Sequence, residues 1–238
     1  MPENQNINHG NYSEIGYFKI AFLTIFAILL TFGLVFLSAG RIDYWQGGAF
    51  CGIILLITVF QLVLFSDQID LAKERLKPGP GVKWWDKIFY ALFKPTFLAI
   101  IILACLDAGR YGWSPRLPLI VYIISYPLFL LSIFITIWAM RTNKFFSSMV
   151  RIQSDRGHYV VTDGPYRCVR HPGYTGGIFM AVTTPLILGS LWGLIPAGAV
   201  VLLLIVRTIL EDRTLKNDLS GYAEYAKKVR YKIFTGIW

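Results

Sequence analysis

Two short polar segments in the C-terminal part of the chain carry the side chains best suited to chemistry, and the first is residues 162–174, TDGPYRCVRHPGY. Asp-Gly-Pro is a turn sequence, the residue before a proline avoids the α region, and Pro172 suits the first turn of a helix. We therefore expect Arg170 and His171 at the start of a helix, beside free backbone N–H groups that favour an anion such as a carboxylate or phosphate. The alternative is that Arg167 and Arg170 only reach toward lipid headgroups.

The second segment is residues 207–215, RTILEDRTL. Arg207 and Glu211 are four residues apart and share one face of a helix. Glu211 and Asp212 project about 100° apart, so one can face a cavity while the other pairs with a neighbouring side chain. Ionisable groups at the end of an apolar span are costly and usually face protein or water. The alternative is an ordinary charged helix end in solvent.

The elements that must position these segments are apolar runs long enough to cross a bilayer. The chain is 55% hydrophobic and 16% charged, whereas soluble domains are about 25% charged. The last two runs are short and are joined at Gly189-Ser190, so a helical hairpin fits them as well as two full crossings. The sequence thus predicts an all-α, polytopic transmembrane bundle of about six spans: Tyr17–Ser38, Gly48–Ser66, Ile88–Asp107, Leu117–Met140, Tyr174–Gly189 and Leu191–Val206.

Charge placement sets the expected topology. With a cytoplasmic N-terminus and six crossings, all of the 23 Lys and Arg residues except Arg41, Arg110 and Arg116 fall on the cytoplasmic side, which is the positive-inside pattern. We assign the net charge of +9 to topology and to contact with anionic membrane lipids, and we expect no nucleic-acid partner. Both termini and both polar segments are then cytoplasmic.

The three cysteines indicate neither a metal centre nor a disulfide framework. Cys51 and Cys105 lie in apolar spans, Cys168 lies on the expected cytoplasmic side, and no Cys-x-x-Cys occurs, so no metal site is expected. We divide the chain into a polar N-terminal tail at 1–16, a four-span transmembrane region at 17–140 and a region at 141–238 that carries both polar segments.

The polar segments together resemble a known superfamily. The patterns are GPYRxVRHPxY at 164–174, RxxxEDxxL at 207–215 after an apolar hairpin, and GYxxY at 221–225. They resemble the isoprenylcysteine carboxyl methyltransferase and phospholipid methyltransferase superfamily over residues 141–238, which we interpret as the catalytic region. One departure is Asp212, where that superfamily often has a second Glu, so the charge is kept but the side chain reaches less far.

This resemblance implies a membrane-embedded methyltransferase that uses S-adenosylmethionine (SAM) and takes a lipophilic acceptor from the bilayer. His171 and Tyr174 would hold the amino-acid end of SAM, with Arg170 in support, and Glu211 would hold its ribose or amino group. The side chains fit, because a carboxylate needs Arg or His and an amino group needs a carboxylate, and no Gly-x-Gly-x-x-Gly offers a dinucleotide-type fold instead. The implied cofactor-binding residues are Tyr166, Arg170, His171, Tyr174, Glu211 and Asp212.

Arg207 and Glu211 are the catalytic candidates. Since the sulfonium methyl is already activated, catalysis consists mostly of aligning the acceptor and excluding water. Arg207 would orient an acceptor carboxylate, which is ionised at pH 7 and needs no base. An amine would need one, and only Glu211 or Tyr166 is placed to serve. A carboxylate or thiol is therefore favoured, an isoprenylcysteine-like carboxylate most of all, while a phospholipid amine and a small isoprenoid acid stay open.

Two other classes of function fit parts of the sequence. The C-terminal motifs are similar to those of NADPH-dependent sterol reductases, although 238 residues is short for such chains. A non-enzymatic transporter or assembly subunit would place charged or broken helices near the middle of the membrane. Lys94-Pro95 in the third span is the candidate for that, and Lys94 is close enough to the inner face to snorkel.

Overall fold

The computed structural model describes residues 9–64 and 80–238, and within them every regular element is a helix, which confirms the all-α prediction. Residues 1–8 of the predicted tail and Ser66 at the predicted end of the second span lie outside the described residues. The shorter elements are the π-helical η1 (Cys105–Tyr111) and the 3₁₀ turns η2 (Ser154–Arg156) and η3 (Gly164–Arg167). The α-helices are α1 (His9–Ala39), α2 (Trp45–Leu64), α4 (Trp84–Ala104), α5 (Leu119–Thr142), α6 (Pro172–Ile187), α7 (Leu194–Asp218) and α8 (Tyr222–Lys228).

Five helical segments in the described part of the chain are long and apolar enough to cross a membrane, with mean hydropathies between 2.1 and 2.5. They are α1 from Ala21 onward, α2, α4 together with η1, α5, and α7. The fifth predicted span, Tyr174–Gly189, corresponds to α6, whose 16 residues fall short of the roughly 20 that a full crossing needs. The chain is a multi-pass membrane protein.

Helices α6 and α7 form the hairpin that the sequence allowed. The chain reverses at Gly189, whose φ of +82° is a backbone conformation that glycine adopts without strain. Helix α7 continues past Val206, the predicted end of the last apolar span, to Asp218, which agrees with the expectation that Arg207 and Glu211 share one face of a helix. The charged residues Arg207 and Asp212 are buried against protein partners, so the helix need not end where its apolar run does.

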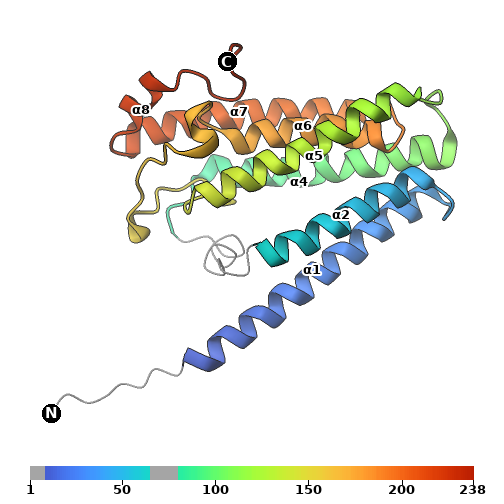
Figure 1. The fold of residues 1–238 in the computed structure, drawn as a ribbon, viewed down its shortest axis with the longest axis horizontal. Helices are drawn as coiled ribbons and strands as arrows, with labels where there is room; N and C mark the ends of the chain where they lie inside the picture. Colours follow the sequence, from blue (N-terminus) through green and yellow to red (C-terminus); the bar gives the residue numbers. More distant parts are fainter. Residues whose placement is uncertain (1–8, 65–79) are drawn as a thin grey trace.

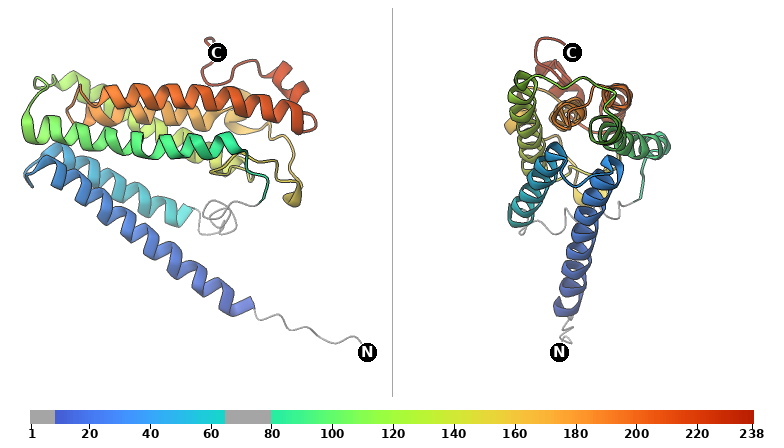
Figure 2. Two further views of the ribbon diagram at one scale, coloured as in Figure 1. Left: turned by 180° about the vertical axis from the view of Figure 1, so that it is seen from behind. Right: turned by 90° about the vertical axis from the view of Figure 1, so that its right-hand side faces the viewer.

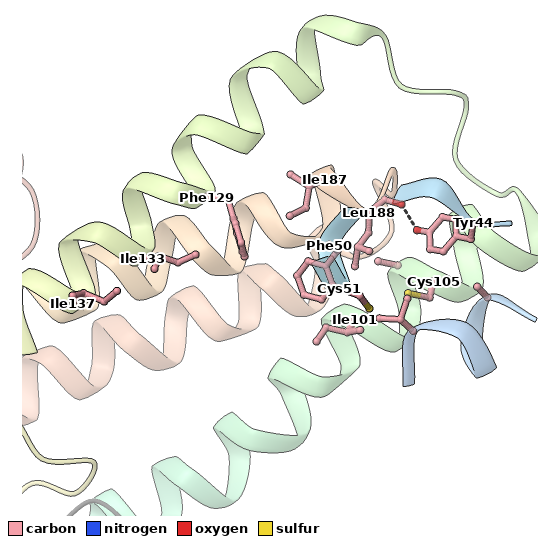
Figure 3. Close-up of a cluster of buried hydrophobic side chains, with 13 residues drawn as sticks. Tyr44, Phe50, Cys51, Ile101, Cys105, Phe129, Ile133, Ile137, Ile187 and Leu188 are labelled. Carbon is pink, nitrogen blue, oxygen red and sulfur yellow. Dashed lines mark hydrogen bonds between the residues drawn. The ribbon is translucent and has the colours of Figure 1, made fainter. Parts of the chain in front are cut away.

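Helices α4, α5, α6 and α7 lie side by side in one bundle, whereas α1 and α2 pack against it near η1 and diverge from it elsewhere (Figures 1 and 2). An apolar cluster that includes Phe50, Ile101 and Phe129 fills the contact between these two parts (Figure 3). The Tyr44 hydroxyl donates a hydrogen bond to the Leu188 carbonyl (Figure 3), so the α1–α2 pair is pinned to the turn of the α6–α7 hairpin.

A buried carboxylate fixes the same end of the bundle. Asp107 of η1 is completely buried and accepts hydrogen bonds from the Ser114 backbone N–H at 2.6 Å and from the Ser190 hydroxyl at 2.5 Å. Because Ser190 follows α6, this carboxylate ties the end of α4–η1 to the hairpin turn.

Close packing of α6 on α5 orients the start of α6. A Cβ atom added to Gly176 would lie 2.6 Å from the Ser132 carbonyl oxygen on α5, so only glycine allows the two backbones to approach this closely. Since α6 begins at Pro172, this contact fixes where the first polar segment enters the bundle.

Candidate active site

Both polar segments open onto one cavity of about 490 Å³, a size typical of small-molecule sites, about 300–1,000 Å³. Its walls come from the start of α4, from segment 143–161, from η3 and the start of α6, and from the last turns of α7 with α8. Of the seven predicted site residues, six line it: Tyr166, Arg170, His171, Tyr174, Arg207 and Glu211.

The seventh residue, Asp212, does not line the cavity. Its Oδ1 atom accepts hydrogen bonds from Arg170 Nε at 2.7 Å and from the Tyr222 hydroxyl at 3.1 Å. Lys216 Nζ is 2.9 Å from Oδ2, and His171 Nε2 is 3.5 Å from Oδ1. Asp212 therefore pairs with protein groups while Glu211 faces the cavity, as their angular separation on the helix indicated.

Arg170 holds the C-terminal segment 229–232 in place through hydrogen bonds. Besides pairing with Asp212, its Nη1 atom donates to the carbonyls of Val229 at 2.7 Å and Arg230 at 2.8 Å. The backbone N–H groups of Arg170 and His171 donate to the carbonyls of residues 231 and 232 at 3.0 and 2.8 Å. The returning chain therefore occupies these two N–H groups, and they are not available to an anion.

Glu211 forms the polar part of the cavity wall together with an aromatic pair. The Tyr174 hydroxyl donates a hydrogen bond to Glu211 Oε2, and the Tyr174 ring stacks on the His171 ring with centroids 5.6 Å apart. In the part of the chain that the structure describes, no cation lies within ion-pair distance of Glu211. Glu211 thus presents a carboxylate to any ligand.

Arg207, only 6% exposed, lies one turn before Glu211 on α7 and is held by groups of α4 and of segment 143–161. Its Nε atom is 2.9 Å from Asp86 Oδ1, and its Nη2 donates to Asp86 Oδ2 at 3.1 Å and to the Ser148 carbonyl at 2.7 Å. Its Nη1 donates to the Tyr90 hydroxyl at 3.0 Å. The guanidinium carbon also lies 4.7 Å from the centroid of the Tyr90 ring, a cation–π contact.

Asp86 and Tyr90 were missed from the sequence, because both lie on α4, far from the two polar segments. The available signal was Asp86 itself, an acidic residue directly after Trp84-Trp85 and just before an apolar run. A carboxylate at that depth needs a partner, but the sequence does not say that the partner is Arg207.

Segment 143–161 contributes a histidine that sequence reasoning also missed. His158 packs against Phe145 with ring centroids 4.5 Å apart and ring planes inclined by 38°, and its Nδ1 accepts the Gln153 backbone N–H at 3.2 Å. Burial, aided by the positive charge of Arg151, lowers the pKa of His158 to about 4. The imidazole is therefore neutral at pH 7 and does not attract an anion by charge.

Tyr166 is a poor general base in this fold. It is buried, and burial raises the pKa of its phenol further above the ordinary value. Its hydroxyl accepts a hydrogen bond from Asn143 Nδ2 at 3.3 Å. Since the phenol stays protonated, Glu211 is the better placed of the two candidate bases.

Membrane helices supply an apolar part of the cavity wall. Phe93 comes from α4, Gly177 from α6 and Leu204 from α7. These three positions lie inside the bundle rather than in the polar segments, so the cavity joins a polar compartment to an apolar one. Such a site can hold a polar cofactor next to a lipophilic molecule.

Residues 120–220 match the model of the phospholipid methyltransferase family. The superfamily resemblance of the two motifs is thereby confirmed. The match begins before residue 141, so the catalytic region drawn at 141–238 stays a prediction.

Named relatives agree with this family match. The protein-S-isoprenylcysteine O-methyltransferase of Schizosaccharomyces pombe is 23% identical over 220 residues, which cover 83% of this chain and 87% of the relative. The probable protein-S-isoprenylcysteine O-methyltransferase of Oryza sativa subsp. indica is 31% identical over 86 residues, covering 35% of this chain and 45% of the relative. The protein-S-isoprenylcysteine O-methyltransferase B of Arabidopsis thaliana is 31% identical over 91 residues, which cover 35% of this chain and 44% of the relative. These comparisons support a membrane methyltransferase.

Proposed function

We propose that this protein transfers a methyl group from SAM to the carboxylate of a lipophilic acceptor, such as an isoprenylcysteine-like group. The observation that carries the proposal is that the Glu211 carboxylate, the Arg207 guanidinium and apolar residues of α4, α6 and α7 line the same cavity. The names of the relatives support the same acceptor class.

The polar compartment suits SAM by charge. Arg170 and Arg207 are each paired with an aspartate, whereas Glu211 has no cation partner among the described residues, so the wall favours a positively charged ligand. Glu211 would hold the cofactor's amino group or ribose, and His171 and Tyr174 would hold its amino-acid end. When bound, SAM supplies an activated sulfonium methyl group.

The acceptor's place follows from Arg207. Both N–H groups of Nη2 and one of Nη1 are used by the protein, which leaves one Nη1 N–H to orient an acceptor oxygen. The apolar wall at Phe93, Gly177 and Leu204 would hold the lipid chain and exclude water. A carboxylate acceptor needs no base, which agrees with a neutral His158 and a protonated Tyr166.

We also propose that the cavity opens to the cytoplasm. The start of α4, the end of α5, the start of α6 and the end of α7 meet at this end of the bundle. Most of the Lys and Arg residues flank those helix ends, as the positive-inside rule requires of a cytoplasmic face.

A nicotinamide reductase is less well supported. NADPH carries several negative phosphate charges, whereas the charge on the cavity wall that lacks an ion-pair partner among the described residues is the negative Glu211. The named relatives are methyltransferases.

The test is calorimetric binding of SAM and of NADPH to the detergent-purified protein and to His171→Ala. We expect micromolar SAM binding that His171→Ala weakens at least about tenfold, as for loss of a buried polar contact, with no NADPH binding. Tyr126→Phe, which alters a tyrosine away from the cavity, is the matched control and should bind SAM normally. NADPH binding without SAM binding would overturn the proposal in favour of a reductase, and binding of neither would favour a transporter or subunit.

A further inference from the structure

Asp86 belongs to neither sequence motif and precedes the family match, yet it is completely buried beside the cavity. Its carboxylate pairs with Arg207 through both oxygens, and Oδ2 also accepts the Val150 backbone N–H at 2.6 Å. A buried charge is costly unless it is paired and hydrogen-bonded. Asp86 therefore joins α4, α7 and the 143–161 wall into one unit.

We propose that Asp86 is a positioning residue for methyl transfer, which fixes the direction in which Arg207 points and cancels its charge. This inference rests on the proposed function, in which Arg207 orients an acceptor carboxylate. Asp86 and the Ser148 carbonyl take both N–H groups of Nη2, and Tyr90 takes one of Nη1. The guanidinium plane is thus set: Nε faces Asp86 Oδ1 at 2.9 Å as an ion pair, and one Nη1 N–H is left for the acceptor.

The net charge of the Asp86–Arg207 pair matters because methyl transfer neutralises two opposite charges. An acceptor carboxylate oxygen forms a bond to the methyl carbon while the carbon–sulfur bond breaks and its electron pair goes to sulfur. The negative charge of the acceptor and the positive charge of the sulfonium disappear together. An unpaired cation at Arg207 would stabilise the ionised acceptor more than the transition state and so lower kcat. Paired with Asp86, Arg207 gives a directional hydrogen bond without that excess stabilisation.

The experiment compares Asp86→Asn with wild type, using N-acetyl-S-farnesylcysteine as the acid and its methyl ester as the neutral product. We expect the ratio of acid to ester affinity to rise about tenfold, as for buried charges left unpaired, and kcat to fall about tenfold or more. The Kd for SAM should stay within about threefold of wild type. Asp86→Glu, which keeps the charge, should restore the acid-to-ester ratio.

Asp107→Asn is the matched control, because Asp107 is an equally buried aspartate at the far end of the same span. It should lower Tm and leave the acid-to-ester ratio unchanged. Asp86→Asn could behave in the same way, with a lower Tm but an unchanged acid-to-ester affinity ratio and an unchanged kcat per folded molecule. Asp86 would then be merely structural, and the inference would be overturned.

A second pair of variants covers the case in which Asp86→Asn does not fold. Arg207→Gln leaves Asp86 unpaired and should weaken acid binding relative to ester, and Asp86→Asn/Arg207→Gln removes both charges and should recover part of that loss. No recovery would overturn the inference. A wild-type protein that binds SAM but methylates no carboxylate would show instead that the proposed acceptor is wrong, before any variant is made.

Discussion

At the scale of single residues, the arginines on the cavity wall are neutralised by aspartates of the protein itself. Arg170 pairs with Asp212 and Arg207 with Asp86. The two arginines that the sequence suggests as ligand-binding residues therefore spend most of their hydrogen-bonding capacity within the protein. Glu211 differs, because its carboxylate accepts a hydrogen bond from the neutral Tyr174 hydroxyl and has no cation partner among the described residues. Electrostatic selection of the ligand therefore depends more on one carboxylate than on the net positive charge of the chain.

A prediction at this scale concerns His158. Its pKa of about 4 lies below the roughly 6.5 of an unfolded histidine, so the unfolded chain binds more protons between those pH values. The stability that neutral His158 contributes is present above pH about 6.5 and is lost as pH falls toward about 4. We expect His158→Gln, measured as Tm against pH in detergent, to lose less Tm than wild type across this window. Parallel curves for the two proteins would contradict the pKa shift.

At the scale of elements, the close approach of α5 and α6 decides where the first polar segment sits. Gly176 faces the Ser132 carbonyl, whereas Gly198 on α7 has open space where a Cβ would be. The two glycines lie in helices of one bundle and differ in this respect, so they make a matched pair.

We expect Gly176→Ala to destabilise the protein by about 1–3 kcal/mol, because overpacking forces the helices apart. Gly198→Ala should be neutral or stabilising by up to about 1 kcal/mol, since alanine favours the helix. Thermal unfolding of both variants measures this, and SAM binding should weaken in Gly176→Ala alone. Equal Tm values would show that the α5–α6 contact has room to adjust.

At the scale of the whole molecule, the bundle has two ends with different roles. One end is tied together by Asp107, Ser190 and the Tyr44–Leu188 contact, and the other carries the cavity. The proposed sidedness places the cavity end in the cytoplasm, and the cysteines allow a direct test.

Cys168 is exposed next to the cavity end, while Cys51 and Cys105 are buried. We expect a membrane-impermeant maleimide to label Cys168 in inverted vesicles and not in intact cells. Trp113→Cys, at an exposed position in the loop at the opposite end, should show the reverse pattern. Labelling of Cys168 in intact cells would mean that the proposed topology is inverted.

The sequence by itself determined the membrane class, the all-α fold and the two motifs, because these depend on local properties. Span length and hydropathy predict membrane helices, proline and glycine mark turns, and the spacing of Glu211 and Asp212 shows that they face different ways. That one of the two acids would face a cavity and the other would pair with a neighbour followed from helix geometry alone.

Only the tertiary structure decided which partners these residues find. Asp86 and Arg207 are separated by 120 intervening residues, and no local pattern couples them. The carbonyls that occupy the Arg170 and His171 backbone N–H groups come from the chain returning after α8, a pairing that no local sequence pattern indicates. Such long-range pairings arise because buried charges and backbone groups must all be satisfied once the helices pack, and that requirement can be read only in three dimensions.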